Sequence, residues 1–199
     1  MSATRKRQAE VRRETKETRV RLALDLDGAG EARIESPSGF LNHMLHLLAR
    51  HALVNLEVEA SGDTEVDLHH TVEDIGICLG QALDEALGSK EGIVRFASVA
   101  VPMDEARAEV SLDLSGRPML VYRVAFPGER VGEFETALVE EFLQGFVNNA
   151  RLTLHVSVPC GTNDHHIAEA VFKGLARALK EAVARDPRVS GTPSTKGVL

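Results

Sequence analysis

Two copies of a five-residue motif, each with paired histidines and a glutamate, are the most chemically informative feature of the chain. HHTVE occupies residues 69–73 and HHIAE occupies residues 165–169, 96 positions later, so four of the eight histidines lie in these motifs. Imidazole nitrogens and carboxylate oxygens are common ligands of divalent transition metals. One copy could arise by chance. Two copies that each open a similar helical segment indicate a duplicated unit that holds metal.

The spacing within each motif predicts how its ligands are shared. On a helix, His69 and Glu73 lie on one face because they are four residues apart, and His70 lies three residues from Glu73. The adjacent histidines point about 100° apart around the helix axis and cannot easily bind one ion together. A lone His-x-x-x-Glu pair is usually part of a solvated helix face, but duplication at matched positions favours ligation. Each motif is therefore expected to supply ligands to two different metals.

The repeat extends well beyond the motifs and predicts the elements that position them. Matching segments alternate like half-buried strands or show helical periodicity, and glycine turns follow the first pair. Strands align at 19–28 and 107–116 (offset 88) and at 56–60 and 152–156 (offset 96). Two helices also align, and they begin with the segments 41–45 and 139–143 (offset 98). Weaker strands are predicted at 32–35 and 119–124, and the helices opened by the motifs end near Leu87 and Ala184.

Each half is therefore predicted to run strand, strand, helix, strand, helix, which gives an α+β fold with helices packed on one face of each sheet. Half 1 covers about residues 8–92, half 2 covers about residues 93–187, and residues 188–199 form a C-terminal tail. No linker separates the halves, so residues 1–199 are expected to form a single pseudo-symmetric domain. The alignment pairs His43 with Glu141, and each is expected to complete one of two related metal sites.

The composition favours a cytoplasmic protein over a nucleic-acid-binding or membrane protein. A formal net charge of −7 argues against nucleic-acid binding, which depends largely on lysine and arginine. No signal peptide is recognisable, and no apolar stretch is long enough to span a bilayer. Cys78 and Cys160 provide no disulfide framework, and neither is assigned to the site. A solvated terminus is expected to contain the basic residues Arg5, Lys6, Arg7, Arg12 and Arg13.

A wider set of motifs, in the same order from about Arg13 to the C-terminus, resembles the imidazoleglycerol-phosphate dehydratase family of histidine biosynthesis. The motifs are TKET at 15–18, LDLDG at 24–28, FLNHML at 40–45, DLHHTVED at 67–74, SGRP at 115–118, HHIAEA at 165–170 and STKG at 194–197. The chain departs from the family at Asn42, where aspartate is usual, and at Glu141, where some members carry a metal-binding histidine. The resemblance implies a duplicated fold like domain 2 of ribosomal protein S5. It also implies two Mn²⁺ ions per active site and a cubic homo-oligomer of about 24 subunits. Because the adjacent histidines of a motif face different directions, one subunit is not expected to complete both ligand shells. Each site is therefore expected to combine the two motifs from different chains, with metal binding linked to assembly.

The resemblance also implies roles for individual residues. Metal ligation is implied for His43, His69, His70, Glu73, Glu141, His165, His166 and Glu169. Contact with a phosphate-bearing substrate, whose charge calls for cations and hydrogen-bond donors, is implied for Glu17, His43, His69, Arg95, Arg117, His165, Lys173, Ser194, Thr195 and Lys196. Catalytic roles are implied for Glu17, His51, Glu73 and Glu169, of which Glu17 and His51 are the candidates for moving protons. Because Glu17 aligns with Glu105 at offset 88, the repeat alone does not single it out.

The implied reaction dehydrates imidazole glycerol phosphate to imidazole acetol phosphate through a metal-bound imidazolate and a diazafulvene-like intermediate. The proton to be lost is not next to a carbonyl, so an unaided base is inadequate, whereas a metal lowers the pKa of the bound ring. Two alternatives remain open at this stage: a metallohydrolase that attacks a phosphoester, and a metal-stabilised structural or RNA-binding module. The acidic balance, the single tyrosine and the absence of tryptophan speak against RNA. Zinc, iron or cobalt would suit the same ligands.

Overall fold

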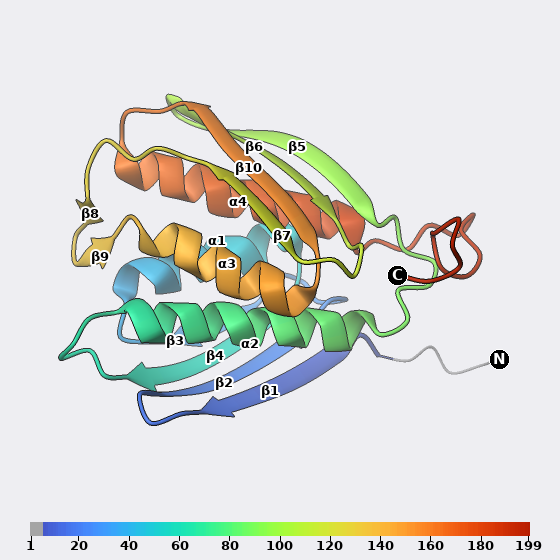
Figure 1. The fold of residues 1–199 in the computed structure, drawn as a ribbon, viewed down its shortest axis with the longest axis horizontal. Coiled ribbons are helices and arrows are strands. Elements are labelled where there is room, and N and C mark those ends of the chain that lie inside the picture. The colour runs from blue at the N-terminus through green and yellow to red at the C-terminus, as the bar shows by residue number, and fades with distance from the viewer. Residues whose placement is uncertain (1–5) are drawn as a thin grey trace.

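Two four-stranded sheets enclose four helices in the computed structural model, which describes residues 6–199 (Figure 1). The layers follow the order sheet, helices, helices, sheet. The first sheet, in the order β1-β2-β4-β3, contains β1 (Gln8–Glu14), β2 (Thr18–Asp25), β3 (Ala32–Glu35) and β4 (Asn55–Gly62). The second, in the order β5-β6-β10-β7, contains β5 (Phe96–Met103), β6 (Ala106–Asp113), β7 (Met119–Arg123) and β10 (Thr153–Cys160). The helices are α1 (Gly39–Ala52), α2 (His69–Leu87), α3 (Leu138–Ala150) and α4 (Asp164–Ala182), and a hairpin of β8 (Arg130–Val131) and β9 (Phe134–Glu135) precedes α3.

The predicted duplication is confirmed, and each sheet contains one strand more than the sequence pattern indicated, while the β8-β9 hairpin of the second half was not predicted. β1 and β5 are edge strands that pair antiparallel with β2 and β6. Inward and exposed positions alternate along β1, but Arg13 occupies one of the three inward positions, so the apolar alternation by which a half-buried strand is recognised from sequence is weak. β2 and β6 have neighbours on both sides and bury alternate residues, as the sequence predicts. The helices cover one face of each sheet, also as predicted.

The first helix of each half packs against the second helix of the other half, so α1 meets α4 and α3 meets α2. Glycines make the α2–α3 contact very close. A Cβ atom on Gly76 would lie 2.5 Å from the Phe142 carbonyl oxygen, and one on Gly145 would lie 2.9 Å from the Glu73 carbonyl oxygen. The two backbones therefore approach at these positions to a distance that leaves no room for a side chain. This exchange of partners brings each histidine motif beside the first helix of the opposite half.

Apolar side chains from both sheets and all four helices fill the space between the layers. Val20, Leu22 and Leu24 of β2 point inward at every second position and are almost fully buried. Burying each such side chain stabilises the fold by about 1.5–3 kcal/mol. The Phe142 and Phe172 rings, with centroids 5.2 Å apart, join α3 to α4 across the centre. The core therefore holds the N-terminal turns of the helices in fixed relative positions.

The expectation of a solvated basic terminus is wrong for Arg7, which is buried, and for Arg13, which is half-buried in β1, whereas Lys6 and Arg12 are exposed as expected. Arg13 Nε donates to Asp74 Oδ1 at 2.7 Å, which ties the edge strand to α2, and Asp74 is itself buried. A buried carboxylate requires such a partner, and that requirement explains why the basic run is structured. Arg5 lies outside the described residues.

The predicted offset between β4 and β10 is also wrong. Leu24 pairs with Leu56 in the first sheet, and its counterpart Leu112 pairs with Leu154 in the second, so the two strands correspond at offset 98 and not 96. A shift of two residues keeps every side chain on the same face, so the alternating pattern cannot detect it. The offset returns to 96 at the motifs because the loop before α2 is longer than the loop before α4.

Candidate active site

Both histidine motifs open a helix at the same end of the molecule (Figure 1). This histidine end comprises residues 38–46, 67–73, 128–137 and 163–169. Asp67 Oδ1 accepts a hydrogen bond from the His69 backbone N–H at 2.7 Å. Asn163 Oδ1 accepts from the backbone N–H groups of His165 and His166 at 2.9 and 3.3 Å. These side chains satisfy free N–H groups of the first turn, and they hold both motifs at the helix starts.

His43, His165 and Glu169 form the one trio of potential ligands in residues 6–199 whose donor atoms all lie within 4.8 Å of one another. Glu169 Oε2 lies 3.6 Å from His43 Nε2 and 3.3 Å from His165 Nε2. His43 comes from α1, whereas His165 and Glu169 lie one turn apart on α4. The structure thus brings together three of the predicted ligands from opposite halves of the chain, and we call this set the α1–α4 trio.

Glu169 is ionised and oriented before any metal binds. Burial raises its pKa, but the hydrogen bond and charge of Lys173, with Nζ 2.5 Å from Oε1, and the neighbouring histidines leave the pKa below its ordinary value. Lys173, predicted to bind substrate, therefore holds one oxygen of Glu169 while the other faces His43 and His165. Two imidazole nitrogens and a carboxylate oxygen suit a divalent transition metal, so the residues fit the predicted cofactor class.

Aromatic rings and the β8-β9 hairpin support the trio from one side. The Phe40 ring lies edge-on to His165 with centroids 5.2 Å apart, and Phe40 in turn packs on Phe134 of β9 at 5.1 Å. The Gly128 N–H donates to Asp164 Oδ1 at 3.0 Å, so the loop before the hairpin is tied to the first residue of α4. These contacts restrict the rotation of the His165 ring.

The second histidine of each motif faces a carboxylate. His70 Nδ1 lies 3.0 Å from an Asp63 oxygen and 3.9 Å from a Glu17 oxygen, and His166 Nδ1 lies 2.7 Å from a Glu105 oxygen. The hydrogen bond to Asp63 raises the pKa of His70, and the one to Glu105 raises the pKa of His166. The same bond from His166, with backbone N–H donors, lowers the pKa of Glu105 to about 2.

The remaining predicted ligands, His69, Glu73 and Glu141, lie on α2 and α3. Their placement mirrors that of the α1–α4 trio, because α2 carries the first motif and α3 packs against it. The close contact of Gly145 with the Glu73 carbonyl holds the two helices together one turn beyond Glu141. Their donor atoms do not form a compact trio in the part of the chain that the structure describes.

The two residues predicted to move protons have different surroundings. Glu17 is exposed in the turn between β1 and β2, beside His70. His51 lies two turns beyond His43 on α1 and is partly buried. Burial, together with the charges of Lys173 and Arg177, lowers the pKa of His51. The His51 ring is therefore neutral near pH 7.

Arg95 anchors the C-terminal tail. Its guanidinium binds Asp113 through Nε at 2.7 Å and Nη2 at 3.1 Å, and it donates to the Pro193 carbonyl oxygen through Nη1 at 2.7 Å. Only 12% of the Arg95 side chain is exposed, so most of its donors are committed within the chain. The structure thus brings Arg95 to the predicted phosphate-binding residues but surrounds it with protein partners.

Arg117 and the tail segment 194–197 lie at the same end as Arg95, which we call the tail end. Arg117 is 68% exposed and lies 3.7 Å from Asp113. The Ser194 hydroxyl accepts from the Lys196 backbone N–H at 3.2 Å, and the Lys196 and Thr195 side chains are exposed. Exposed cations beside hydroxyl donors are suited to a phosphate group.

The histidine end and the tail end lie at opposite ends of α4 (Figure 1). The Arg95 N–H donates to the carbonyl oxygen of Ala182, the last residue of α4, at 2.9 Å, whereas His165 is in the first turn. At a rise of about 1.5 Å per residue, the helix between His165 and Ala182 spans about 25 Å. Within one chain, the predicted metal ligands and the predicted phosphate-binding residues therefore do not meet.

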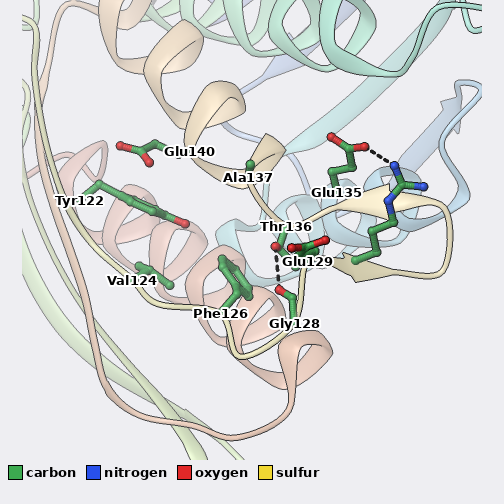
Figure 2. A pocket seen from close by; sticks show the side chains of 10 residues that line it. Tyr122, Val124, Phe126, Gly128, Glu129, Glu135, Thr136, Ala137 and Glu140 are labelled. Atoms are coloured by element: carbon green, nitrogen blue, oxygen red, sulfur yellow. Dashed lines mark hydrogen bonds and ion pairs between the residues drawn. The ribbon is translucent and has the colours of Figure 1, made fainter.

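The cavity drawn in Figure 2 adjoins the histidine end, but none of the predicted site residues lines it. It has a volume of about 470 Å³ and is formed by β7, the β8-β9 hairpin and the start of α3. Thr136 Oγ1 donates to the Gly128 carbonyl oxygen at 3.0 Å on its wall, and the buried Tyr122 hydroxyl has no hydrogen-bond partner among the described residues. Glu140 lines the cavity, but its neighbour Glu141 and the other predicted site residues do not. The α1–α4 trio is therefore the better candidate for the reaction centre.

Comparison with known proteins identifies the family and supports the fold. A family model described as imidazoleglycerol-phosphate dehydratase matches residues 36–179. The chain belongs to the imidazoleglycerol-phosphate dehydratase family. A protein of that name from Azorhizobium caulinodans is 60% identical over 194 residues, which cover 97% of this chain and 98% of the relative. Another from Bacillus velezensis is 58% identical over 193 residues, which cover 97% of this chain and all of the relative.

Solved structures of the family share the fold. The crystal structure of imidazoleglycerol-phosphate dehydratase from Staphylococcus aureus superimposes with a TM-score of 0.82 at 40% identity, covering 90% of this chain and 99% of the other. The structure from Pyrococcus furiosus gives a TM-score of 0.82 at 38% identity, covering 95% of this chain and 100% of the other. Family membership confirms that the protein is an enzyme of histidine biosynthesis, a hydro-lyase. The metallohydrolase and structural-module alternatives are thereby set aside.

Sequence reasoning in this dehydratase missed the carboxylates that hold the functional side chains in place, namely Asp63, Glu105 and Asp113. The repeat contained a signal for Glu105, because it aligns with the predicted Glu17. Asp63 and Asp113 carried no such signal. Their roles depend on which loop approaches which side chain, and a linear pattern does not contain that information.

Proposed function

We propose that the protein dehydrates imidazole glycerol phosphate to imidazole acetol phosphate, with Mn²⁺ as the metal and two ions per active site. The observation that carries the proposal is the α1–α4 trio, which offers two imidazole nitrogens and a carboxylate oxygen within 4.8 Å. The shared name of the relatives supports the substrate and the reaction. The mixed nitrogen and oxygen donor set supports a divalent transition metal.

The trio would hold one ion, and its counterparts on α2 and α3 would hold the other. The second set consists of His69, Glu73 and Glu141, with His70 and His166 available to complete the two ligand shells. A divalent cation held by these residues would supply Lewis acidity, which lowers the pKa of a bound imidazole ring. Lys173 supports binding because it keeps Glu169 ionised and fixes one of its oxygens.

The chain itself supplies the proton transfers. Dehydration breaks the C–O bond of the hydroxyl beside the ring, which leaves as water after gaining a proton, and removes a proton from the next carbon. The resulting enol becomes the ketone after a further proton transfer. Glu17 is exposed beside His70, and His51 is neutral near pH 7 because its pKa is lowered, so both can exchange protons. Glu73 and Glu169 take part as carboxylates of the ligand sets.

Arg117 and Lys196 would bind the substrate phosphate, with hydrogen bonds from Ser194 and Thr195. Arg117 presents a fork-shaped guanidinium and Lys196 a point charge, and both are exposed. Arg95 acts mainly by fixing the tail, since its donors are bound to Asp113 and Pro193. Phosphate binding by the tail thus depends on the conformation in which Arg95 holds it.

A complete site requires more than one subunit. A three-carbon chain separates the ring of the substrate from its phosphate, and it cannot span the roughly 25 Å between the two ends of one chain. We infer that the histidine end of one subunit faces the tail end of another in a homo-oligomer. A cubic assembly of about 24 subunits with closed symmetry would supply such contacts.

The proposal extends to the cellular location and the binding partners of the enzyme. Among the described residues, no helix is long and apolar enough to cross a membrane. We propose a cytoplasmic location, with the phosphate substrate and further copies of the chain as partners. A role for nucleic acid or for a membrane is not part of the proposal, since the net charge is −7.

Turnover of purified enzyme tests the proposal. Enzyme stripped of metal by a chelator should form no ketone from imidazole glycerol phosphate, and added Mn²⁺ should restore the activity. His165→Ala should lose both activity and bound metal. Glu109→Ala, which changes an exposed carboxylate on β6, should lose neither. Full turnover without metal would contradict the metal dependence, and release of inorganic phosphate without ketone would indicate a phosphohydrolase.

A further inference from the structure

The second histidine of each motif is held from one side of its ring. His70 Nδ1 lies 3.3 and 3.0 Å from the two carboxylate oxygens of Asp63, and His166 Nδ1 lies 2.7 Å from Glu105 Oε2. The Nε2 atom of neither histidine makes a hydrogen bond among residues 6–199, and the nearest carboxylate oxygen to His166 Nε2, from Asp104, is 3.7 Å away. Each imidazole is therefore anchored at Nδ1 and presents Nε2.

The two carboxylates occupy positions that do not correspond in the repeat. Glu105, in the turn between β5 and β6, is the counterpart of Glu17, in the turn between β1 and β2. Asp63 follows the last residue of β4, and at the offset of 98 the matching position after β10 is Gly161. Gly161 has no side chain that could reach the histidine, and the backbone N–H of the next residue, Thr162, donates to Glu105 Oε1 at 3.1 Å. The same contact is thus made by different elements in the two halves.

We propose that Asp63 and Glu105 are positioning residues that fix the Nδ1–H tautomer of His70 and His166 and direct each Nε2 toward a metal ion. The inference rests on the proposed function, in which both histidines are ligands. A ligating imidazole commonly donates its other N–H to a carboxylate, which fixes the ring and increases the basicity of the ligating nitrogen. Duplication alone would have produced carboxylates at matching positions. Their appearance at unmatched positions indicates that the contact itself is needed in both halves.

Because Asp63 and not Glu17 binds the second histidine of the first motif, the matching residues Glu17 and Glu105 have different roles. Glu105 accepts from the His166 ring and from the backbone N–H groups of Thr162 and Asn163, so both of its oxygens are occupied. The Glu17 side chain is 56% exposed and lies 3.9 Å from His70, outside hydrogen-bond distance. Because Asp63 holds His70, the Glu17 carboxylate is available to exchange protons with a substrate.

The tautomer can be measured in the metal-free protein. The ¹⁵N resonances of a neutral imidazole differ between the Nδ1–H and Nε2–H forms, so solid-state spectra of sedimented protein with ¹⁵N-labelled histidine rings report the tautomer. Comparison with His70→Gln and His166→Gln assigns the signals. At a pH above the raised pKa values, we expect the Nδ1–H form for both histidines. In the Asp63→Ala variant the His70 signals should shift to a mixture of the two forms. The Glu59→Ala variant, which removes an exposed carboxylate on β4, should leave the His70 and His166 signals unchanged.

Metal affinity provides the second measurement. Titration with Mn²⁺ should show about 10- to 100-fold weaker binding in Asp63→Ala and Glu105→Ala. The Asp63 side chain bonds to His70 and to no other described residue, so Asp63→Ala tests positioning with little effect on folding. Glu105 also caps the loop before α4. For that reason Glu105→Gln, which keeps an acceptor oxygen and loses the charge, is the matched variant and should show a smaller loss.

The two proposals fail in different ways. If the unaltered protein binds no Mn²⁺, the proposed function is wrong. The tautomer spectra still test whether Asp63 and Glu105 hold the histidine rings at Nδ1. If Mn²⁺ binds equally well to Asp63→Ala and Glu59→Ala, the positioning role is overturned while the metal site remains. An Nε2–H form of His70 in the unaltered protein would also overturn it.

Discussion

Mixed oligomers should reveal an active site built from two subunits. His165→Ala removes a ligand at the histidine end, and Lys196→Ala removes a cation at the tail end. Each variant alone should have little activity, because every site contains the defect. The two positions are separated by roughly the 25 Å length of α4, so a site that needs both groups must draw them from different chains. Oligomers that contain both variants should therefore regain activity.

The size of the recovery follows from counting chains. In a random equal mixture, half of the sites receive an intact histidine end and half receive an intact tail, so about a quarter of the sites are complete in a symmetric assembly. Turnover per subunit should reach about one quarter of that of the unaltered enzyme. Co-expression of the two variants with different affinity tags, followed by purification on both tags, yields the mixed oligomers for a ketone-formation assay.

A matched pair of variants provides the control. His43 and His165 belong to the same trio of one chain. A mixture of His43→Ala and His165→Ala therefore contains no chain with an intact trio and should stay inactive. If the mixture of His165→Ala and Lys196→Ala is no more active than the average of its parents, the sites are not shared as inferred from the length of α4.

Four further outcomes are expected. Arg117→Ala should raise the KM for the phosphate substrate and leave bound metal unchanged in metal analysis, and loss of metal would contradict its assignment. Gly76→Ala should destabilise the fold by about 1–3 kcal/mol in a denaturant titration, because its Cβ would lie 2.5 Å from the Phe142 carbonyl oxygen; unchanged stability would refute the close helix contact. Burial raises the pKa of the Cys78 thiol to about 11, so at pH 8 the exposed Cys160 should react rapidly with a thiol reagent and Cys78 should react only after unfolding. Rapid reaction of both cysteines in the native protein would contradict the burial of Cys78 in the core. Removal of metal by a chelator should give a smaller oligomer in ultracentrifugation, because a metal bound across subunits stabilises the assembled state; an unchanged sedimentation coefficient would remove the claim that metal drives assembly.

The duplicated fold was predictable because each central strand and each motif helix has a strong periodic pattern in both halves. The edge strands β1 and β5 were not, because their residue types do not follow the alternation of exposed and inward positions: Arg13 stands at an inward position of β1, and Phe96 at an exposed position of β5. The offset of β4 was also uncertain by two residues, because such a shift does not alter which side chains face the core. Periodicity thus predicts the elements well and their register poorly.

The candidate site was predictable in its residue types but not in its arrangement. The alignment of His43 with Glu141 indicated that two helices join the motifs, and the α1–α4 trio shows one such meeting. The distance between the motifs and Lys196 could not be predicted, because it depends on the direction of α4 between them. Nor could the sequence show that Arg95 is committed to Asp113, since that pairing joins positions on two separate elements.

The central claim is that metal ligands and phosphate-binding residues from different subunits form one dehydratase site. A crystal structure with Mn²⁺ and a stable triazole-bearing phosphate analogue, recorded with anomalous scattering from manganese, tests it most directly. We expect anomalous density beside Nε2 of His43 and His165, with the phosphate of the same analogue beside Lys196 of another subunit. Manganese density away from the trio, or an analogue bound without any contact to a second subunit, would contradict it.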